Sequence, residues 1–274
     1  MDHLPSIALL GYGEAGSHFG RDLVAAGVPV RVYDPEVTPP DAVEVCADEA
    51  DAVRGVDAVL SVNSTSSAMA ALVAALPSLG SDTIWADLNT ASPDLKRRLA
   101  EVAAEAGVRF ADVAIMAPVP GKGLRVPMLA SGEAAEDVAS LLGDLDTPIS
   151  VQEGPAGAAA ERKLLRSVFF KGIGAAVVEA LAAARRAGCE EWLRKNIAAE
   201  LAEAGPETVE RLVTGTNKHA RRRYDEMAAS VDMLRELGVE PLVSTASRDL
   251  LGNLLAEQEQ AALPFESPPR LRPS

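Results

Sequence analysis

An apolar run that ends in three glycines at fixed offsets constrains this chain more than any other feature. The segment is "IALLGYGEAGSHFG" (residues 7–20), which contains Gly11, Gly13 and Gly16. "IALL" predicts a strand and "AGSHFGRDLVAAG" (15–27) predicts a helix, so the glycines form the turn between the two. In such a turn the first glycine permits the sharp bend, the second lets the backbone approach a pyrophosphate, and the third lets the helix pack on the strand.

The acid at the end of the next predicted strand indicates which dinucleotide would bind. "PVRVYD" (29–34) ends at Asp34, close to the offset of about 20 residues at which this motif places a ribose-binding acid. A carboxylate there bonds the ribose hydroxyls of NAD(H) and repels the 2′-phosphate of NADP(H). No arginine follows in "DPEVTPP", which favours NAD(H). NADP(H) is possible if Arg21 or Arg31 reaches a phosphate.

The predicted cofactor site therefore combines the glycine motif with the acid. Its free N–H groups and the dipole at the start of the helix would face the phosphates. The alternative is a glycine turn and a loop aspartate that hold no ligand. The residues predicted to bind cofactor here are Gly11, Tyr12, Gly13, Glu14, Ala15, Gly16 and Asp34.

Strands and helices alternate through the first half of the chain, and the second half reads as helical throughout. Alternation at this spacing predicts βαβ units, hence an α/β fold with a Rossmann-type doubly wound sheet over residues 1–153. A long helical stretch begins at residue 154, and no strand pattern follows it. We therefore expect an all-helical domain for substrate binding and dimerisation over 154–262, and a proline-rich tail over 263–274.

Composition narrows the classes of partner. The 274 residues carry a formal net charge of −14, which repels nucleic-acid backbones. Cys46 and Cys189 are the only cysteines and belong to no CxxC or Cys/His cluster, so we expect neither a disulfide framework nor a metal site. The N-terminal apolar run is too short for a signal sequence or a membrane span. These features predict a cytoplasmic protein with no nucleic-acid or membrane partner.

Three further segments resemble those of the β-hydroxyacid dehydrogenase family. "DLNTASP" (87–93) resembles its D-x-[SN]-T-x-S-P segment, and "ADVAIMAPVPGKG" (111–123) is similar to its substrate loop. "GAAAERKLLRS" (157–167) resembles its catalytic segment. The family includes 3-hydroxyisobutyrate and 6-phosphogluconate dehydrogenases, and imine reductases are relatives. The three segments occur in the family's order.

The second half carries a separate resemblance. "TGTNKHARRRYDEMAASVDMLRELGV" (214–239) is similar to a short C-terminal domain of the phosphogluconate dehydrogenase-like type. True 6-phosphogluconate dehydrogenases have a much longer helical domain, for which this chain has no room. We therefore do not expect 6-phosphogluconate as the substrate.

The resemblance implies that Lys163 is the general acid and base. A lysine partly desolvated beside a cofactor has its pKa lowered toward neutrality and can exchange a proton with the substrate. Ser167, one helical turn further, could hydrogen-bond the substrate. Arg166 and Ser167 stand where the family has two asparagines, which makes a standard 3-hydroxy acid doubtful. Spacing alone leaves open a solvated lysine on an ordinary amphipathic helix.

The loop that resembles the substrate loop also departs from the family. Pro120 replaces the family's serine, Gly121 is kept, and Lys122 replaces the next glycine. A cation at Lys122 could hold a substrate carboxylate in place of the lost contacts. Lys122 could equally be a solvated loop residue.

Polar residues at other predicted strand ends complete the candidate site. Asn63 and Ser64 follow one strand and could contact the nicotinamide ribose, or else belong to a helix-capping loop. The resemblance places Asn89 and Thr90 near nicotinamide or substrate. His219 lies on a helix face with ordinary ion pairs, or anchors substrate in the cleft between the domains.

These observations predict an NAD(P)-dependent oxidoreductase. It would transfer hydride between the nicotinamide cofactor and a small hydroxy acid or carbonyl substrate, with Lys163 as general acid/base. The alternatives are an imine (C=N) reductase and a non-catalytic nicotinamide-dinucleotide-binding protein. The long apolar helical half predicts a homodimer.

Overall fold

The computed structural model describes residues 4–40 and 42–262. The proline-rich tail predicted over 263–274 lies outside the described residues. The chain divides into two compact units, residues 1–168 and 169–274. Each unit is described by itself.

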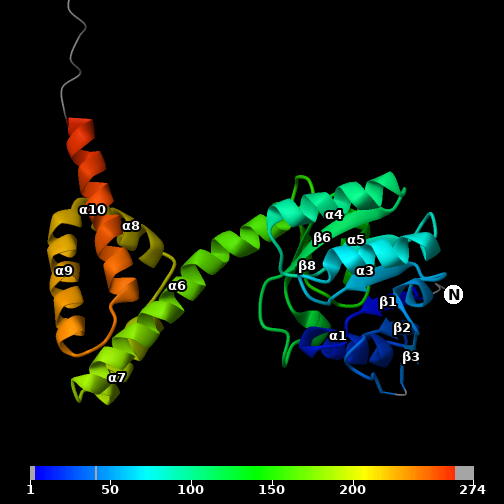
Figure 1. The fold of residues 1–274 in the computed structure, drawn as a ribbon, viewed down its shortest axis with the longest axis horizontal. Coiled ribbons are helices and arrows are strands. Elements are labelled where there is room, and N and C mark those ends of the chain that lie inside the picture. The colour runs from blue at the N-terminus through cyan, green and yellow to red at the C-terminus, as the bar shows by residue number, and fades with distance from the viewer. Residues whose placement is uncertain (1–3, 41, 263–274) are drawn as a thin grey trace, which may run out of the picture. The chain divides into compact units, whose positions relative to one another are not determined.

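The first unit is built on one eight-stranded sheet (Figure 1). The order is β3-β2-β1-β4-β5-β6-β7-β8, and every neighbouring pair is parallel except β6 and β7. The predicted Rossmann-type sheet is confirmed; its two edge strands, β3 and β8, and the antiparallel turn into β7 were not anticipated. The strands are β1 (Ile7–Leu10), β2 (Val30–Tyr33), β3 (Glu44–Val45), β4 (Ala58–Ser61), β5 (Ile84–Asp87), β6 (Arg109–Ile115), β7 (Met128–Ser131) and β8 (Ile149–Val151).

Helices cover both faces of this sheet because its central strands are apolar on both sides. Alternate residues of β1 belong to different cores: Ile7 and Leu9 pack with α1 and α5, and Ala8 and Leu10 pack with α2, α3 and α4. Strands buried on both faces read as continuous apolar runs, which is how "IALL" appears in the sequence. The helices are α1 (Glu14–Ala25), α2 (Glu49–Ala52), α3 (Ala68–Ala75), α4 (Pro93–Glu105) and α5 (Ala135–Gly143).

The strand order places a topological switch point at β1. Its neighbours are β2 on one side and β4 on the other, so the chain leaves β1 and β4 toward opposite faces of the sheet. The crevice outside the carboxyl ends of such strands is where ligands of open α/β sheets bind. Gly11 lies there with a positive φ of 104°, and a Cβ on it would approach the Val62 carbonyl oxygen to 2.7 Å. No other residue type fits this contact without a shift of backbone.

The long helix α6 (Ala158–Arg186) belongs to both units. The sequence places the domain boundary between residues 153 and 154, whereas the division by contacts falls between Val168 and Phe169. The reason is local: the backbone N–H groups of Gly157 and Ala160 donate to Asp112 of β6, which ties the first turn of α6 to the sheet.

Helices joined by short turns make up the second unit, with no strand among its described residues, as predicted. Glu179 of α6 accepts hydrogen bonds from the backbone N–H groups of Val243 and Ser244 and so caps the start of α10. His219 separates α8 from α9. The helices after α6 are α7 (Glu190–Ala202), α8 (Thr208–Lys218), α9 (Ala220–Glu236) and α10 (Leu242–Ala262).

Among the described residues, α6 is the one helix long and apolar enough to cross a membrane. Its most apolar 18-residue window has a mean hydropathy of 1.6, and 11% of that window is buried. Length and composition are the only basis for this finding. The exposed apolar side chains of α6 include Leu165, Val168 and Val178.

Candidate functional site

The glycine turn after β1 has the geometry of a phosphate cradle. A Cβ on Gly13 would meet nothing within 4 Å, whereas a Cβ on Gly16 would overlap the carbonyl oxygen of Gly11. Gly13 is the N-cap of α1, and no side chain caps the helix there. The first N–H groups of α1 therefore have no helical partner and face open space, which suits an anion. These residues fit a dinucleotide pyrophosphate.

Asp34, at the carboxyl end of β2, bonds the glycine turn directly. Its Oδ2 accepts from the Tyr12 N–H at 2.6 Å, and its Oδ1 accepts from Glu36 N and Val37 N at 2.8 and 2.9 Å. Burial raises the pKa of Asp34, but the three N–H donors outweigh burial, so the pKa lies below its ordinary value. The carboxylate thus shapes the turn as well as lying where a ribose-binding acid is expected.

Tyr12 takes a structural place within the predicted cofactor motif. Its ring is buried and lies against Gly20, where a Cβ would come within 2.7 Å of the ring. Burial raises the pKa of its hydroxyl, which the charge of Arg21 partly offsets. Its N–H is bonded to Asp34. In the first turn of α1, Glu14 is exposed, whereas Ala15 is half-buried and packs against the core.

Two amide oxygens at the switch point are buried without a partner among the described residues. They are Oδ1 of Asn63, after β4, and Oδ1 of Asn89, after β5. Asn89 donates from Nδ2 to Ser61 Oγ at 3.1 Å and to Asp87 Oδ2 at 2.9 Å, which fixes its orientation. An unpaired buried acceptor costs free energy, so both oxygens call for a donor such as a ligand hydroxyl or amide.

Ser64 is engaged in its own loop. Its hydroxyl lies 2.9 Å from Ser66 Oγ and 2.8 Å from Ser67 Oγ, and it accepts from Ser67 N at 3.2 Å. These contacts stay within the loop before α3, whose N-cap is Ser67 and which no side chain caps. A role for Ser64 toward the cofactor stays a prediction.

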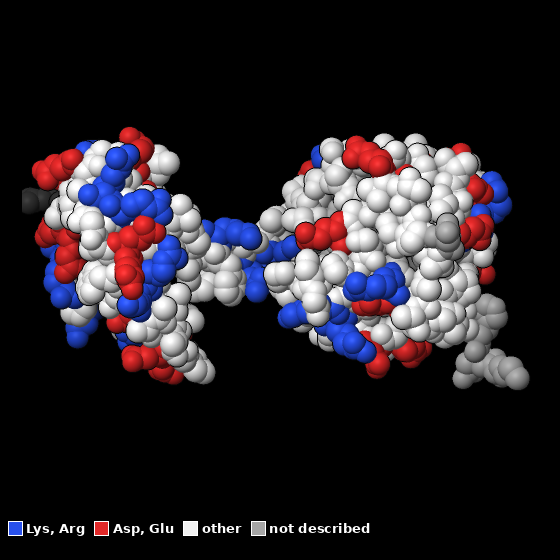
Figure 2. Space-filling model, turned by 90° about the horizontal axis from the view of Figure 1, so that it is seen from below, with Lys and Arg blue, Asp and Glu red and all other residues white. Residues whose placement is uncertain are grey.

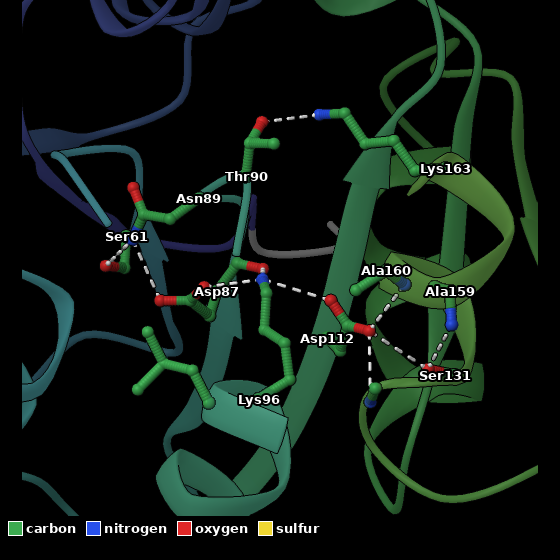
Figure 3. A network of polar contacts seen from close by, with 12 residues as sticks. Ser61, Asp87, Asn89, Thr90, Lys96, Asp112, Ser131, Ala159, Ala160 and Lys163 are labelled. Atoms are coloured by element: carbon green, nitrogen blue, oxygen red, sulfur yellow. Dashed lines mark hydrogen bonds and ion pairs between the residues drawn. The ribbon is translucent and has the colours of Figure 1, made fainter. Parts of the chain in front are cut away.

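Lys163 extends from the second turn of α6 toward the loop after β5. Its Nζ donates to Thr90 Oγ1 at 2.7 Å (Figure 3). The side chain is half-buried. Burial and the nearby charge of Lys96 lower the pKa of Lys163 to about 8, against an opposing pull from Asp112. The structure thus joins Lys163 and Thr90, which the sequence separates by 73 residues.

A buried ion cluster lies beside this pair, and the sequence analysis missed it. Lys96 of α4 is 1% exposed, and its Nζ lies 2.6 Å from Asp87 Oδ1 and 3.0 Å from Asp112 Oδ1 (Figure 3). A signal was present: Lys96 sits beside Leu95 and three residues before Leu99, on the apolar side of its helix. Asp87 and Asp112 likewise interrupt strands that are otherwise apolar.

The α6 segment around Lys163 is basic. Between Glu161 and Glu179 it carries Arg162, Lys163, Arg166 and Lys171 and no acidic residue. Basic side chains are accordingly visible along this helix in Figure 2, between patches of uncharged surface. A positive surface of this kind attracts anions in a protein whose net charge is negative.

No contact among the described residues brings the remaining predicted residues to the Lys163–Thr90 pair or to the buried ion cluster beside it. Ser167 is half-buried on α6, one turn beyond Lys163. Pro120, Gly121 and Lys122 are exposed in the loop after β6, whose next residues pack on α1 through a hydrogen bond from Leu124 N to Asp22. His219 is exposed in the second unit. Their assignment to substrate stays a prediction. No group of three or more potential metal ligands occurs among residues 4–40 and 42–262.

Similarity to known proteins agrees with this geometry. Residues 6–140 match the model of the NAD binding domain of 6-phosphogluconate dehydrogenase, and residues 184–254 match a domain of unknown function, DUF1932. An uncharacterised 28.5 kDa protein of Methanothermus fervidus is 24% identical over 90% of this chain and 98% of its own length.

Solved structures share the fold over nearly the whole chain. A conserved protein of unknown function, described as structurally similar to 3-hydroxyacid dehydrogenases, is 27% identical with a TM-score of 0.59 over 94% of this chain and 100% of its own. A reductive aminase from Aspergillus terreus, in complex with NADPH, cyclohexanone and allyl amine, has a TM-score of 0.79 at 18% identity, over 93% of this chain and 95% of its own. The chain therefore joins an NAD-binding domain of the 6-phosphogluconate dehydrogenase type, within the 3-hydroxyacid dehydrogenase-like fold, to a DUF1932 domain.

Proposed function

We propose that this protein is an NAD(P)-dependent oxidoreductase that interconverts a small carbonyl compound and its alcohol, with Lys163 exchanging the proton. The observation that carries the proposal is the position of the Lys163 amine. It is half-buried, held by Thr90, and has a pKa of about 8 at the carboxyl edge of a sheet that carries a dinucleotide motif. A lysine so poised can act as acid or base near neutral pH.

The chain's own residues divide the binding of the cofactor between them. Gly13 would leave room for the pyrophosphate, Gly11 lets the turn pass close to Val62, and the N-terminus of α1 would supply N–H donors. Asn63 and Asn89 would offer their unpaired amide oxygens to donors of the bound cofactor. When bound, the nicotinamide supplies or receives the hydride. Asp34 favours NAD(H), because a carboxylate at that strand end repels a 2′-phosphate.

Lys163 would complete the proton balance of the reaction. In the direction of reduction, its ammonium form donates a proton to the carbonyl oxygen as negative charge develops there. In the direction of oxidation, the neutral amine removes the proton from the alcohol. Thr90, which accepts a hydrogen bond from Nζ, holds the amine in place in both forms.

An anionic substrate fits the surroundings of Lys163 best. Arg166 and Lys171 follow it on α6, whereas Arg162 is paired with Glu161, and a carboxylate-bearing substrate would gain from the positive stretch after Lys163. Reduction of a C=N bond is the second candidate, supported by the fold shared with the reductive aminase. The basic segment weighs against it, because a protonated imine would meet cations on approach. A protein that binds the dinucleotide without catalysis would have no use for the lowered pKa of Lys163.

We further propose that a second copy of the chain covers α6. Leu165 and Val168 are 65% and 75% exposed, and Phe169 and Phe170 are each 51% exposed. Four large apolar side chains that are this exposed within six residues of one helix favour an interface. The charges of Arg162, Arg166 and Lys171 within the same stretch disfavour a lipid environment, so we favour a protein partner and, with it, a homodimer.

Two measurements test the proposed activity. NADH and NADPH are titrated against the protein side by side, and we expect saturable binding with tighter binding of NADH. The preferred cofactor is then followed at its absorbance with small keto acids, hydroxy acids and cyclic imines. Turnover of the keto or hydroxy acids would support the proposal. Turnover of the cyclic imines alone would show that the reaction is C=N reduction instead. Tight cofactor binding with no turnover of either class would favour the non-catalytic alternative.

A further inference from the structure

A buried cation with two buried carboxylates lies in the core of the first unit, beside the start of α6. Lys96 is 1% exposed, and Asp87 and Asp112 are each 0% exposed. Charges at such depth are costly unless they are paired and hydrogen-bonded. The three residues come from α4, β5 and β6, so the cluster links elements that carry different parts of the proposed site.

The ammonium of Lys96 makes two hydrogen bonds and one further ion pair. Nζ donates to the backbone oxygen of Asp87 at 2.7 Å and to Asp87 Oδ1 at 2.6 Å. It also lies 3.0 Å from Asp112 Oδ1, an oxygen that accepts no hydrogen bond among the described residues. The second oxygen of Asp87 accepts from Asn89 Nδ2 at 2.9 Å, and Asn89 directly precedes Thr90. One side of the cluster therefore orders the loop that carries the partner of Lys163.

The other side of the cluster holds the helix that carries Lys163 itself. Asp112 Oδ2 accepts from the N–H groups of Gly157 and Ala160 at 3.1 and 2.9 Å, and from Ser131 Oγ at 3.4 Å. Ser131 Oγ in turn accepts from Ala159 N at 3.0 Å. A carboxylate that takes the orphan N–H groups of a helix start fixes its first turn and complements its dipole.

We propose that Lys96 and Asp112 are positioning residues for Lys163: together they fix the start of its helix and the loop of Thr90, and so set the place of its amine and the charges around it. The Asp112 carboxylate anchors α6 at Ala160, three residues before Lys163. The Lys96 ammonium holds the carboxylates of Asp87 and Asp112 in place on their neighbouring strands. The inference rests on the proposed role of Lys163 in proton transfer.

The two residues act on Lys163 with opposite sign. The positive charge of Lys96 lowers the pKa of Lys163, and the negative charge of Asp112 raises it. Lys96 of α4 and Asp112 of β6 are the two charged groups that act on the pKa of Lys163 in addition to burial. A purely structural pair would not shift the titration of Lys163 in opposite directions when each charge is removed.

The test measures the titration of Lys163 in the protein without substrate. Competitive acetylation over a range of pH, followed by mass spectrometry of the peptide that contains Lys163, reports the protonation of this amine. We expect Lys96→Met to move the titration midpoint upward by about one pH unit and Asp112→Asn to move it downward. Arg98→Met, which removes an exposed cation of the same helix, should leave the midpoint where it is in the unaltered protein.

Removal of one partner from a buried pair can prevent folding, so a second variant accompanies the first. Lys96→Met with Asp87→Asn keeps the summed charge of the cluster unchanged while it removes the cation next to Lys163. The same upward shift is expected in this double variant. Equal midpoints in all variants, or shifts of the same sign for both single changes, would overturn the proposal. This readout needs no turnover, so it stands apart from the test of the proposed activity.

Discussion

Lys163 and Thr90 join the long helix to the sheet: Nζ of the lysine donates a hydrogen bond of 2.7 Å to Oγ1 of the threonine. Thr90 follows Asn89, whose own amide oxygen is buried and unpaired. The hydrogen-bond partner of Lys163 and an acceptor without a donor thus share one short loop at the carboxyl edge of the sheet.

Two glycines of the turn should respond differently to the same substitution. Gly13→Ala adds a methyl group to open space, so it should weaken NADH binding about tenfold or more, roughly 1.4 kcal/mol, with little change in melting temperature. Gly16→Ala puts the methyl group into the Gly11 carbonyl and should destabilise the fold itself. Cofactor titration and thermal unfolding of both variants check this. Unchanged NADH affinity in Gly13→Ala would argue against a pyrophosphate at this turn.

Asp34 should stabilise the first unit through its ion–dipole contacts. Asp34→Ala removes an acceptor shared by three N–H groups and should lower the free energy of unfolding by about 2 kcal/mol at pH 7. Because the pKa of Asp34 is lowered by folding, this contribution is complete above 3.8 and disappears as the pH falls through the lower, folded value. Urea unfolding at pH 7 and near pH 3 measures the difference. An equal gap between the two proteins at both pH values would contradict the prediction.

The pKa of Lys163 predicts a pH dependence of both rate and stability. The rate of reduction should fall and the rate of oxidation should rise as the pH passes about 8, because the two directions need the charged and the neutral amine respectively. Folding lowers this pKa from 10.5, so the unfolded chain binds the extra proton and stability rises between about pH 8 and 10.5. Lys163→Met should remove that rise. The pH profiles of turnover and of the free energy of unfolding test this prediction, with Lys171→Met as the control that should keep both profiles unchanged.

The apolar face of α6 should control the oligomeric state. Val168→Glu places a charge on a side chain that is 75% exposed in the single chain and should convert a dimer into monomers. Val73→Glu, at an exposed apolar site on α3, serves as the matched control and should leave the mass unchanged. Light scattering after size-exclusion chromatography gives the mass of each. A monomeric unaltered protein at micromolar concentration would contradict the proposed dimer.

Periodicity and turn chemistry predicted most of the first unit, because its central strands are apolar on both faces and its helices have clear starts. Ser92, for example, caps α4, accepting from Leu95 N, directly before the proline that begins the helix. The short edge strands β3 and β8 escaped prediction, since their few residues are partly exposed and carry no strong pattern.

The sequence predicts the parts of the candidate site that local motifs encode, but not the parts that tertiary contacts bring together. The spacing of Gly11 and Asp34 indicates a dinucleotide motif, and Lys163 is indicated by the resemblance of its segment to a family segment. The Lys96–Asp112 ion pair joins residues on a helix and on the following strand, and nothing local distinguishes Lys96 from a solvated lysine except its apolar helix face. Its burial follows from the way α4 packs on the sheet.

The central claim is that the amine of Lys163 transfers the proton while the glycine turn holds the cofactor. The most direct measurement is single-turnover hydride transfer by Lys163→Met, with NADH affinity determined on the same preparation. We predict that hydride transfer slows by about 100-fold or more and that NADH binds as in the unaltered protein, with Lys171→Met unaffected in both respects. Hydride transfer at the unaltered rate in Lys163→Met would contradict the account.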